Sequence, residues 1–177
     1  MACTQTISGL GRDCQANMGG LKKVYIAPFD DGKTIALTGG EITTYTAGVS
    51  APKYMAFNFR NGAASMTSTS TIDAVSGTTM VSTQLVMNFG RMDATKRTEI
   101  QALLQGQVQV IAVDNNGVAW LLGNESPVLA VGSQNGQTGA ARTDANQYTI
   151  TLQDDAPVLP YPFEDDTVYS AVVEEVA

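Results

Sequence analysis

The side chains that most often carry out catalysis are scarce in this chain of 177 residues. It contains no histidine, which excludes Ser-His-Asp and Cys-His catalysis and removes the commonest metal ligand. The adjacent carboxylates Asp154 and Asp155 would lie on opposite faces of a strand, as would Glu174 and Glu175, so neither pair resembles the facing acids of a glycosidase. No P-loop pattern and no strand-linked G-x-G-x-x-G pattern is present. We therefore expect no enzymatic activity, no metal site and no cofactor.

A few short features that look like binding motifs have simpler explanations. Asp30-Asp31-Gly32 and Asp114 to Gly117 offer oxygen ligands for a cation, but both sequences are typical of tight turns. The second also lacks the later glutamate of a calcium loop. Cys3 and Cys14 have no second pair with which to build a metal site, so we expect reduced thiols of minor structural importance.

The net charge of −7, from 10 basic and 17 acidic residues, is concentrated at one end of the sequence. Residues 1–152 contain ten bases and ten acids, whereas residues 153–177 contain seven acids and no base. A protein that grips nucleic acid would show a basic patch or stripe, so tight DNA or RNA binding is disfavoured. No signal-peptide pattern and no apolar run near the ~18 residues of a membrane span is present, so we expect no membrane partner.

A long segment in the middle of the chain carries almost no charge. Asp73 is the one charged residue between Arg60 and Arg91, and eleven positions from Ser65 to Thr83 are serine or threonine. The pattern predicts a long β-hairpin, from about residue 54 to residue 90, whose base is apolar and whose tip is polar.

Alternating apolar residues predict antiparallel strands along most of the remaining chain. Tyr148, Ile150 and Leu152 alternate with polar residues as in a half-buried strand, and Asn115 to Gly117 forms the turn of another hairpin. One helix is expected over about 93–105, with Asp93 as its N-cap. The predicted core comprises Phe57, Phe59, Leu85, Met87, Phe89, Ile100, Leu104, Val110, Trp120, Tyr148, Ile150 and Leu152.

These elements predict a mainly β fold, an antiparallel β-sandwich or barrel with one flanking helix, a long protruding hairpin and extended arms at both ends. The domain boundaries that follow are an N-terminal arm at 1–21, a single sandwich domain at 22–153 and an acidic C-terminal arm at 154–177.

An uncharged, β-prone hairpin invites pairing with another chain, which natural proteins usually prevent with lysines, prolines or bulges. No lysine or proline occurs between Asn61 and Gly90. We therefore expect the hairpins of several copies to pair, and because free edges vanish only on closure, the copies would form a ring. The residues predicted to contact the neighbouring subunit are Met66, Thr67, Thr69, Thr71, Asp73, Thr79, Val81 and Thr83.

The two arms carry opposite charges and are predicted to bridge stacked rings. Residues 1–23 have a net charge of +2, from three bases and one acid, against −7 in the C-terminal arm. The predicted stacking residues are Arg12, Lys22, Lys23, Asp154, Asp155, Glu164, Asp165 and Asp166.

Two stretches resemble the major tail tube proteins of long-tailed bacteriophages. In LVMNFGRMDATKRTEIQALLQGQVQVIAVDNNGVAWLLG, residues 85–123, a strand, a helix, a strand, an Asn-Gly turn and a Trp-containing strand follow in order. The stretch TDANQYTITLQDDAPVLPYPF, residues 143–163, is similar to the last strand and the acidic, proline-bearing tail of such proteins. The resemblance extends from about residue 22 to residue 163.

The resemblance implies a β-sandwich subunit that forms a hexameric ring and stacks with further rings into a tube. The hairpins would then pool into an inner barrel through which genomic DNA passes without specific binding. The implied partners are further copies of the chain and other tail proteins, and the implied location is the virion, after synthesis in the host bacterial cytoplasm. Such lumens are typically negative, whereas this hairpin would supply neutral hydroxyls and Asp73.

Three other interpretations stay open from the sequence. The chain could be another ring protein, such as a tail terminator or head-to-tail connector, or the tube protein of a contractile injection system. It could be a stand-alone ligand-binding β-barrel, which the uncharged hairpin and charged tail disfavour. The hairpin could also be an ordinary surface feature of a monomeric sandwich.

Overall fold

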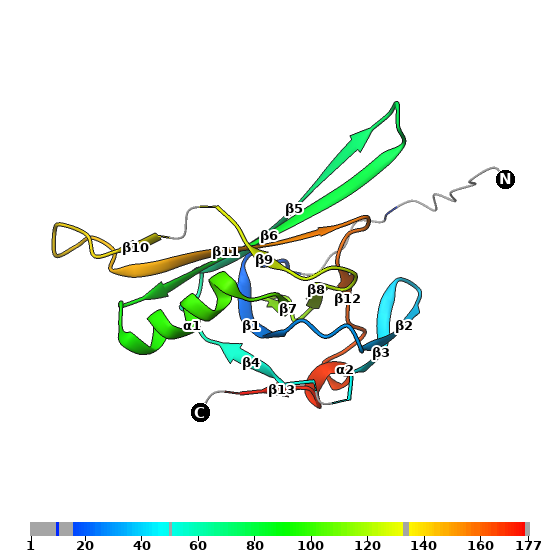
Figure 1. The fold of residues 1–177 in the computed structure, drawn as a ribbon, viewed down its shortest axis with the longest axis horizontal. Coiled ribbons are helices and arrows are strands. Elements are labelled where there is room, and N and C mark those ends of the chain that lie inside the picture. The colour runs from blue at the N-terminus through cyan, green and yellow to red at the C-terminus, as the bar shows by residue number, and fades with distance from the viewer. Residues whose placement is uncertain (1–9, 11–15, 50, 133–134, 176–177) are drawn as a thin grey trace.

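The computed structural model describes residues 10, 16–49, 51–132 and 135–175 of the chain. It is mainly β, with 49% strand and 10% helix and with antiparallel sheets, which confirms the predicted fold class (Figure 1). One sheet has six strands, in the order β12 (Tyr161–Pro162), β8 (Ala119–Leu122), β7 (Val108–Asp114), β1 (Leu21–Pro28), β4 (Tyr54–Phe57) and β13 (Val173–Glu174). Its pairs are antiparallel except for β4 with β13.

The second sheet carries the long hairpin. Its strands run in the order β10 (Asn135–Gln137), β11 (Gln147–Ala156), β6 (Thr78–Gly90) and β5 (Ala64–Asp73), and β9 (Leu129–Ala130) pairs with the other end of β11. A separate two-stranded hairpin is formed by β2 (Thr34–Thr38) and β3 (Glu41–Thr46). The helices are α1 (Ala94–Gln105) and the four-residue α2 (Thr167–Ser170).

The main core lies between the two large sheets and explains the alternation of β6 and β11. Leu85, Met87, Ile150 and Leu152 are fully buried there, together with Val110 of β7. Because side chains alternate along a strand, the intervening residues of β6 and β11 form the opposite face of the sheet.

A second core covers the other face of the six-stranded sheet. It joins Ile111 and Leu121 of that sheet to Ile42 of β3, Phe163 and Tyr169 of α2. Strand β7 therefore lies between two apolar layers, which accounts for its unbroken run of buried residues, Val108 to Val113.

The helix α1 begins where the sequence predicts and buries a slightly different stripe. The side chain of Asp93 accepts a hydrogen bond from Lys96 N (2.8 Å) and caps the first turn. Ile100 and Leu103 are buried in the main core, whereas Leu104 is 39% exposed. The prediction of Leu104 as core was wrong because its neighbour Leu103, one turn after Ile100, takes the inward position.

The hairpin is shorter than predicted. Residues 54–57 form β4 and pair with β1 in the six-stranded sheet, and the hairpin itself spans β5 and β6. The chain passes between the sheets through a turn in which Ala63 N donates to Arg60 O (2.9 Å) and Gly62 has a φ of 78°. The Asn61-Gly62 pair therefore marks a change of sheet.

Four predicted core aromatics are only partly buried. Phe57, Phe59 and Tyr148 pack against the rim of the main core, where β4 crosses to the second sheet and β11 begins. Trp120 is half-buried on β8, next to the two-residue strand β12, and its Nε1 donates to Asp114 Oδ2 (3.4 Å).

The C-terminal segment is not an extended arm. After β11, which continues to Ala156, the chain adds β12 beside β8, forms α2 and ends as β13 along β4. Apolar side chains fix this path, because Phe163 and Tyr169 are each less than a tenth exposed. The acidic residues therefore lie on a folded surface.

Candidate assembly interface

The β5–β6 hairpin projects beyond the rest of its sheet. β5 pairs with β6 from Ala64 opposite Met87 to Asp73 opposite Thr78. β11 pairs with β6 only as far as Val81, opposite Ala156. Beyond that point the two arms of the hairpin contact only each other along their ladder, and Figure 1 shows them extending away from the body of the molecule.

The core-side face of the hairpin, which continues from the main core, becomes polar and exposed toward the tip. Met66 opposite Leu85 belongs to the core layer, and Ser68 opposite Thr83 follows it. Thr83 is 1% exposed and shares a hydrogen bond with Ser68 Oγ (2.8 Å). Val81 is the last buried residue on this face, and Thr79 is exposed.

The predicted contact residues therefore divide between the two faces. Met66, Thr79, Val81 and Thr83 lie on the core-side face, of which only Thr79 is freely exposed. Thr67, Thr69, Thr71 and Asp73 alternate onto the opposite, outer face and are all exposed.

Asp73 has a structural role at the tip. Its Oδ1 accepts hydrogen bonds from the backbone N–H groups of Val75 (2.8 Å) and Ser76 (3.3 Å). These bonds, that from Val75 foremost, hold the pKa of Asp73 below its ordinary value. The one charge of the hairpin thus stabilises its turn.

Large apolar side chains are exposed around this turn. Ile72 is 69% exposed, Val75 98% and Met80 45%. These three side chains give the tip an apolar surface that a single subunit leaves uncovered. The sequence alone does not predict the exposure of these three residues, because it depends on where β11 stops pairing with β6.

The outer edge of β5 has no strand beside it in the described chain. Its ten residues include no lysine and no proline, and no bulge interrupts its register with β6. This edge therefore lacks the usual devices that prevent strand addition.

The outer face of the same sheet is a nearly neutral layer of hydroxyl and amide groups. Gln84 Nε2 donates to Gln153 Oε1 (3.0 Å), and Thr149 Oγ1 donates to Asn88 Oδ1 (2.7 Å), so the groups bond across neighbouring strands. The polar residues of this face are Ser65, Thr67, Thr69, Thr71, Ser82, Gln84, Asn88, Gln147, Thr149, Thr151 and Gln153.

The predicted stacking residues that the structure describes do not form two extended arms. Lys23 lies in β1 and forms an ion pair with Glu175 Oε1 of its own chain (2.6 Å), while Lys22 is exposed. Asp154 is buried in β11, with 5% exposure, and its neighbour Asp155 is exposed. Glu164, Asp165 and Asp166 are exposed on the segment around α2, and Arg12 lies outside the described residues.

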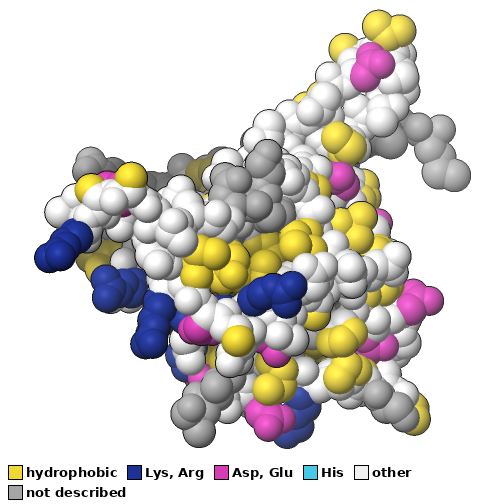
Figure 2. Space-filling model, turned by 60° about the vertical axis from the view of Figure 1, so that its left-hand side comes forward, with side chains coloured by type: hydrophobic (Ala, Val, Ile, Leu, Met, Phe, Trp, Pro, Cys, Tyr) yellow, Lys and Arg dark blue, Asp and Glu magenta, His cyan; other side chains and the backbone are white. Residues whose placement is uncertain are grey.

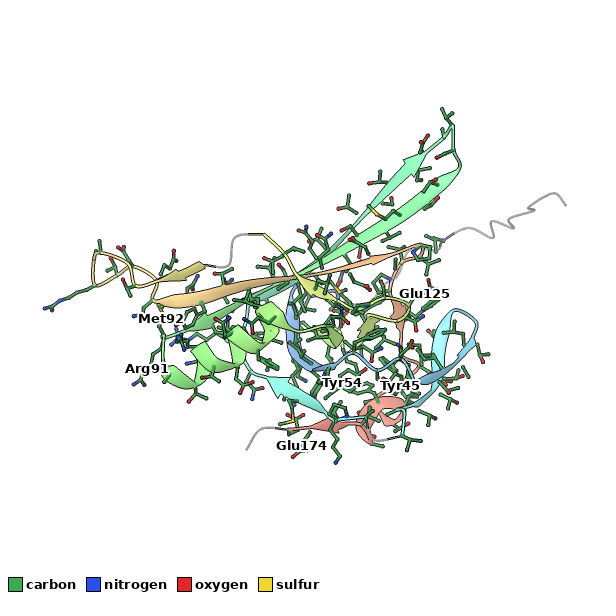
Figure 3. All side chains as sticks on the ribbon, viewed as in Figure 1. Tyr45, Tyr54, Arg91, Met92, Glu125 and Glu174 are labelled. Atoms are coloured by element: carbon green, nitrogen blue, oxygen red, sulfur yellow. The ribbon has the colours of Figure 1, made fainter. Side chains whose placement is uncertain are left out.

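The side chains of Gln109, Tyr54 and Tyr45 form a buried hydrogen-bonded group inside the fold. Gln109 is fully buried: its Oε1 accepts from Tyr54 Oη (2.7 Å), and its Nε2 donates to Gly123 O (2.7 Å). Tyr45 Oη lies 2.7 Å from Tyr54 Oη, and both rings face the second core (Figure 3). Burial raises the pKa of Tyr54 above its ordinary value, so its hydroxyl stays protonated as a hydrogen-bond donor.

Within the described residues, no group of three or more His, Cys, Asp or Glu side chains is arranged to hold a metal ion. The helices of this part of the chain are also too short or too polar to cross a membrane. Comparison of the chain with protein-family models, curated proteins and solved structures finds no match.

Proposed function

We propose that this protein is a structural ring subunit that builds a tube, most specifically the tail tube protein of a long-tailed bacteriophage. The observation that supports it best is the β5–β6 hairpin, whose tip, apolar side chains and β5 edge are left uncovered by the subunit itself. An isolated two-stranded hairpin is marginal in water, so a covering partner would stabilise it.

The partner that fits is the same hairpin sheet of a neighbouring copy. Addition of a strand at β5 would satisfy the free backbone groups of that edge, and closure of a ring would leave no edge exposed. In such a ring the core-side face is occupied by the core as far as Val81, so the outer face of the sheet would line the channel.

The chemistry of that outer face suits the passage of DNA. Neutral hydroxyls and amides hydrate well and do not hold a phosphate as lysine or arginine would. The described strands β5, β6 and β11 contain no lysine or arginine at all, and Asp73 and Asp155 add weak repulsion. The channel wall would therefore let a polyanion slide.

The experiment that tests this function places a lysine on the edge strand β5, where natural proteins use this residue to prevent the addition of another strand. Thr69→Lys, on the exposed outer face of β5, should leave the subunit folded and abolish rings seen by negative-stain electron microscopy. Thr38→Lys, the same change on the exposed hairpin β2–β3, is the matched control and should assemble as the wild type does. Undiminished ring formation by Thr69→Lys would contradict the proposal.

A further inference from the structure

A group of lysine and arginine side chains lies toward one end of the molecule, and a smaller group of acidic side chains lies toward the other. The connection between β6 and α1, where Arg91 and Met92 lie, is at one end of the long axis, and β2, β3, β12 and α2 are at the other (Figures 1 and 3). Figure 2 turns the first end toward the reader and shows a group of Lys and Arg side chains on it.

The first end contains a cleft of about 640 Å³ that we term the basic cleft. It is lined by Arg60, Arg91 and Lys96 and by one acid, Asp144, which leaves a net charge of +2. The Asp144 carboxylate already accepts hydrogen bonds from two backbone N–H groups, those of residues 140 and 141. Arg97 and Arg142 lie nearby, on α1 and on the β10–β11 connection.

The two arginines of the basic cleft are free to bind a partner. Lys96 Nζ is paired with Asp93 (2.7 Å), but the structure gives neither Arg60 nor Arg91 an ion pair among the residues it describes, and both are exposed.

Arg91 is also held in an unusual backbone conformation. Its φ is 63°, in the left-handed region that favours glycine, and it is the one non-glycine residue of the described chain with a positive φ. Arg91 N donates to Asn146 O (2.7 Å) and Met92 N donates to Asn146 Oδ1 (2.9 Å), which fixes the strained turn. The sequence therefore places a long cationic side chain at a position where glycine would be unstrained.

The opposite end contains a cleft of about 340 Å³ that we term the acidic cleft. Glu41, Glu164 and Asp165 line it with the aromatic rings of Trp120 and Tyr169, and no base lines it. The three acids are exposed and have no ion pair within the described residues. Carboxylates beside an open indole are the surroundings that a guanidinium prefers, because it forms forked hydrogen bonds and stacks on aromatic faces.

We propose that the basic cleft of one copy docks onto the acidic cleft of a second copy, so that copies join head to tail. The clefts have opposite sign and lie at opposite ends, so a head-to-tail contact pairs unlike charges, whereas a two-fold contact centred on either cleft alone would pair like charges. A heterologous contact of this kind builds an open stack of copies unless the rotation between successive copies closes a ring. The location of this contact between one ring and the next rests on the proposed function.

Charge reversal tests the docking and separates it from ring closure. Arg91→Glu alone and Glu164→Arg alone should each still form single rings but lose stacked tubes in electron micrographs. A mixture of the two variants, or both substitutions in one chain, should restore stacking, because the reversed charges again face opposite ones. Lys53→Glu carries the same charge change at an exposed position outside both clefts and should stack normally.

The outcomes distinguish the two proposals. Tubes that persist in both single variants would overturn the docking and leave the ring intact. If the wild type forms no rings, the proposed function fails, and sedimentation velocity then tests the docking alone: the mixed variants should form heavier species that neither forms by itself, and their absence would overturn it. Binding of duplex DNA that Arg91→Glu abolishes would assign the basic cleft to nucleic acid and also overturn it.

Discussion

Asp154 combines a buried carboxylate with an unpaired oxygen. Its Oδ2 accepts a hydrogen bond from Gly123 N (3.0 Å), while Oδ1 has no hydrogen-bond partner in the described part of the chain. Burial raises the pKa of this carboxyl above its ordinary value. The proton is then held more tightly in the folded than in the unfolded chain. The stability contributed by Asp154 is complete below the unfolded pKa of about 3.9 and is lost as the pH rises through the higher folded pKa.

Asp154→Asn removes this titration and keeps the shape of the side chain. Its free energy of unfolding should rise relative to that of the wild type as the pH increases from about 4, because only the wild type loses stability from this group. Urea unfolding at several pH values measures the difference. A flat difference between Asp154→Asn and the wild type over this pH range would refute the argument.

The Tyr54–Gln109 pair yields a second prediction about a single residue. Tyr54→Phe removes the donor to Gln109 Oε1 in a fully buried site and should lower the free energy of unfolding by about 1–3 kcal/mol. Tyr161→Phe is a suitable control, because the Tyr161 hydroxyl has no hydrogen bond in the described chain. Equal effects of the two substitutions in denaturant titrations would show that the buried hydrogen bond contributes nothing.

At the scale of elements, α2 and the flanking chain belong to the fold. The Tyr169 ring lies 5.1 Å from that of Phe163 and 6.3 Å from that of Tyr25, measured between centroids. Tyr169→Ala should therefore lower the free energy of unfolding by about 3 kcal/mol, as removal of a buried aromatic does. Ser170→Ala, at an exposed position of the same helix, should change it little. A stable Tyr169→Ala variant would mean that the C-terminal segment detaches easily.

The hairpin tip permits a prediction that separates assembly from folding. Ile72→Thr keeps a β-branched side chain and should change the free energy of unfolding by no more than about 0.5 kcal/mol, because Ile72 is 69% exposed. Ring formation should nevertheless decrease, since a neighbour would lose an apolar contact. Leu37→Thr, at an exposed position on β2, is the control and should affect neither measurement. Normal ring yield from Ile72→Thr would remove the tip from the interface.

Local sequence patterns predict the strands and helices of this protein better than they predict which of these elements pair and pack together. The alternation in β6 and β11 and the cap at Asp93 depend on neighbours in sequence, so the strands and α1 could be predicted. The transfer of β4 to the other sheet and the burial of Asp154 depend on contacts between residues at least 29 positions apart, which no local period encodes. For the same reason the acidic C-terminal residues were predicted as an arm, although they lie on a folded surface.

On the scale of the whole molecule, three features have no complete explanation within one subunit. They are the uncovered β5 edge with its apolar tip, the neutral outer face of the hairpin sheet, and the opposite charges of the two clefts. A ring that closes through the hairpins and stacks through the clefts gives each of them a partner of suitable chemistry. Ring closure is the central step, because the channel and the stacking both depend on it.

Electron microscopy of the purified full chain over a range of concentrations tests ring closure most directly. Closed rings with a central channel, some of them stacked into tubes, are the predicted result. A monodisperse monomer of 18.6 kDa that forms neither rings nor tubes at high concentration would contradict it.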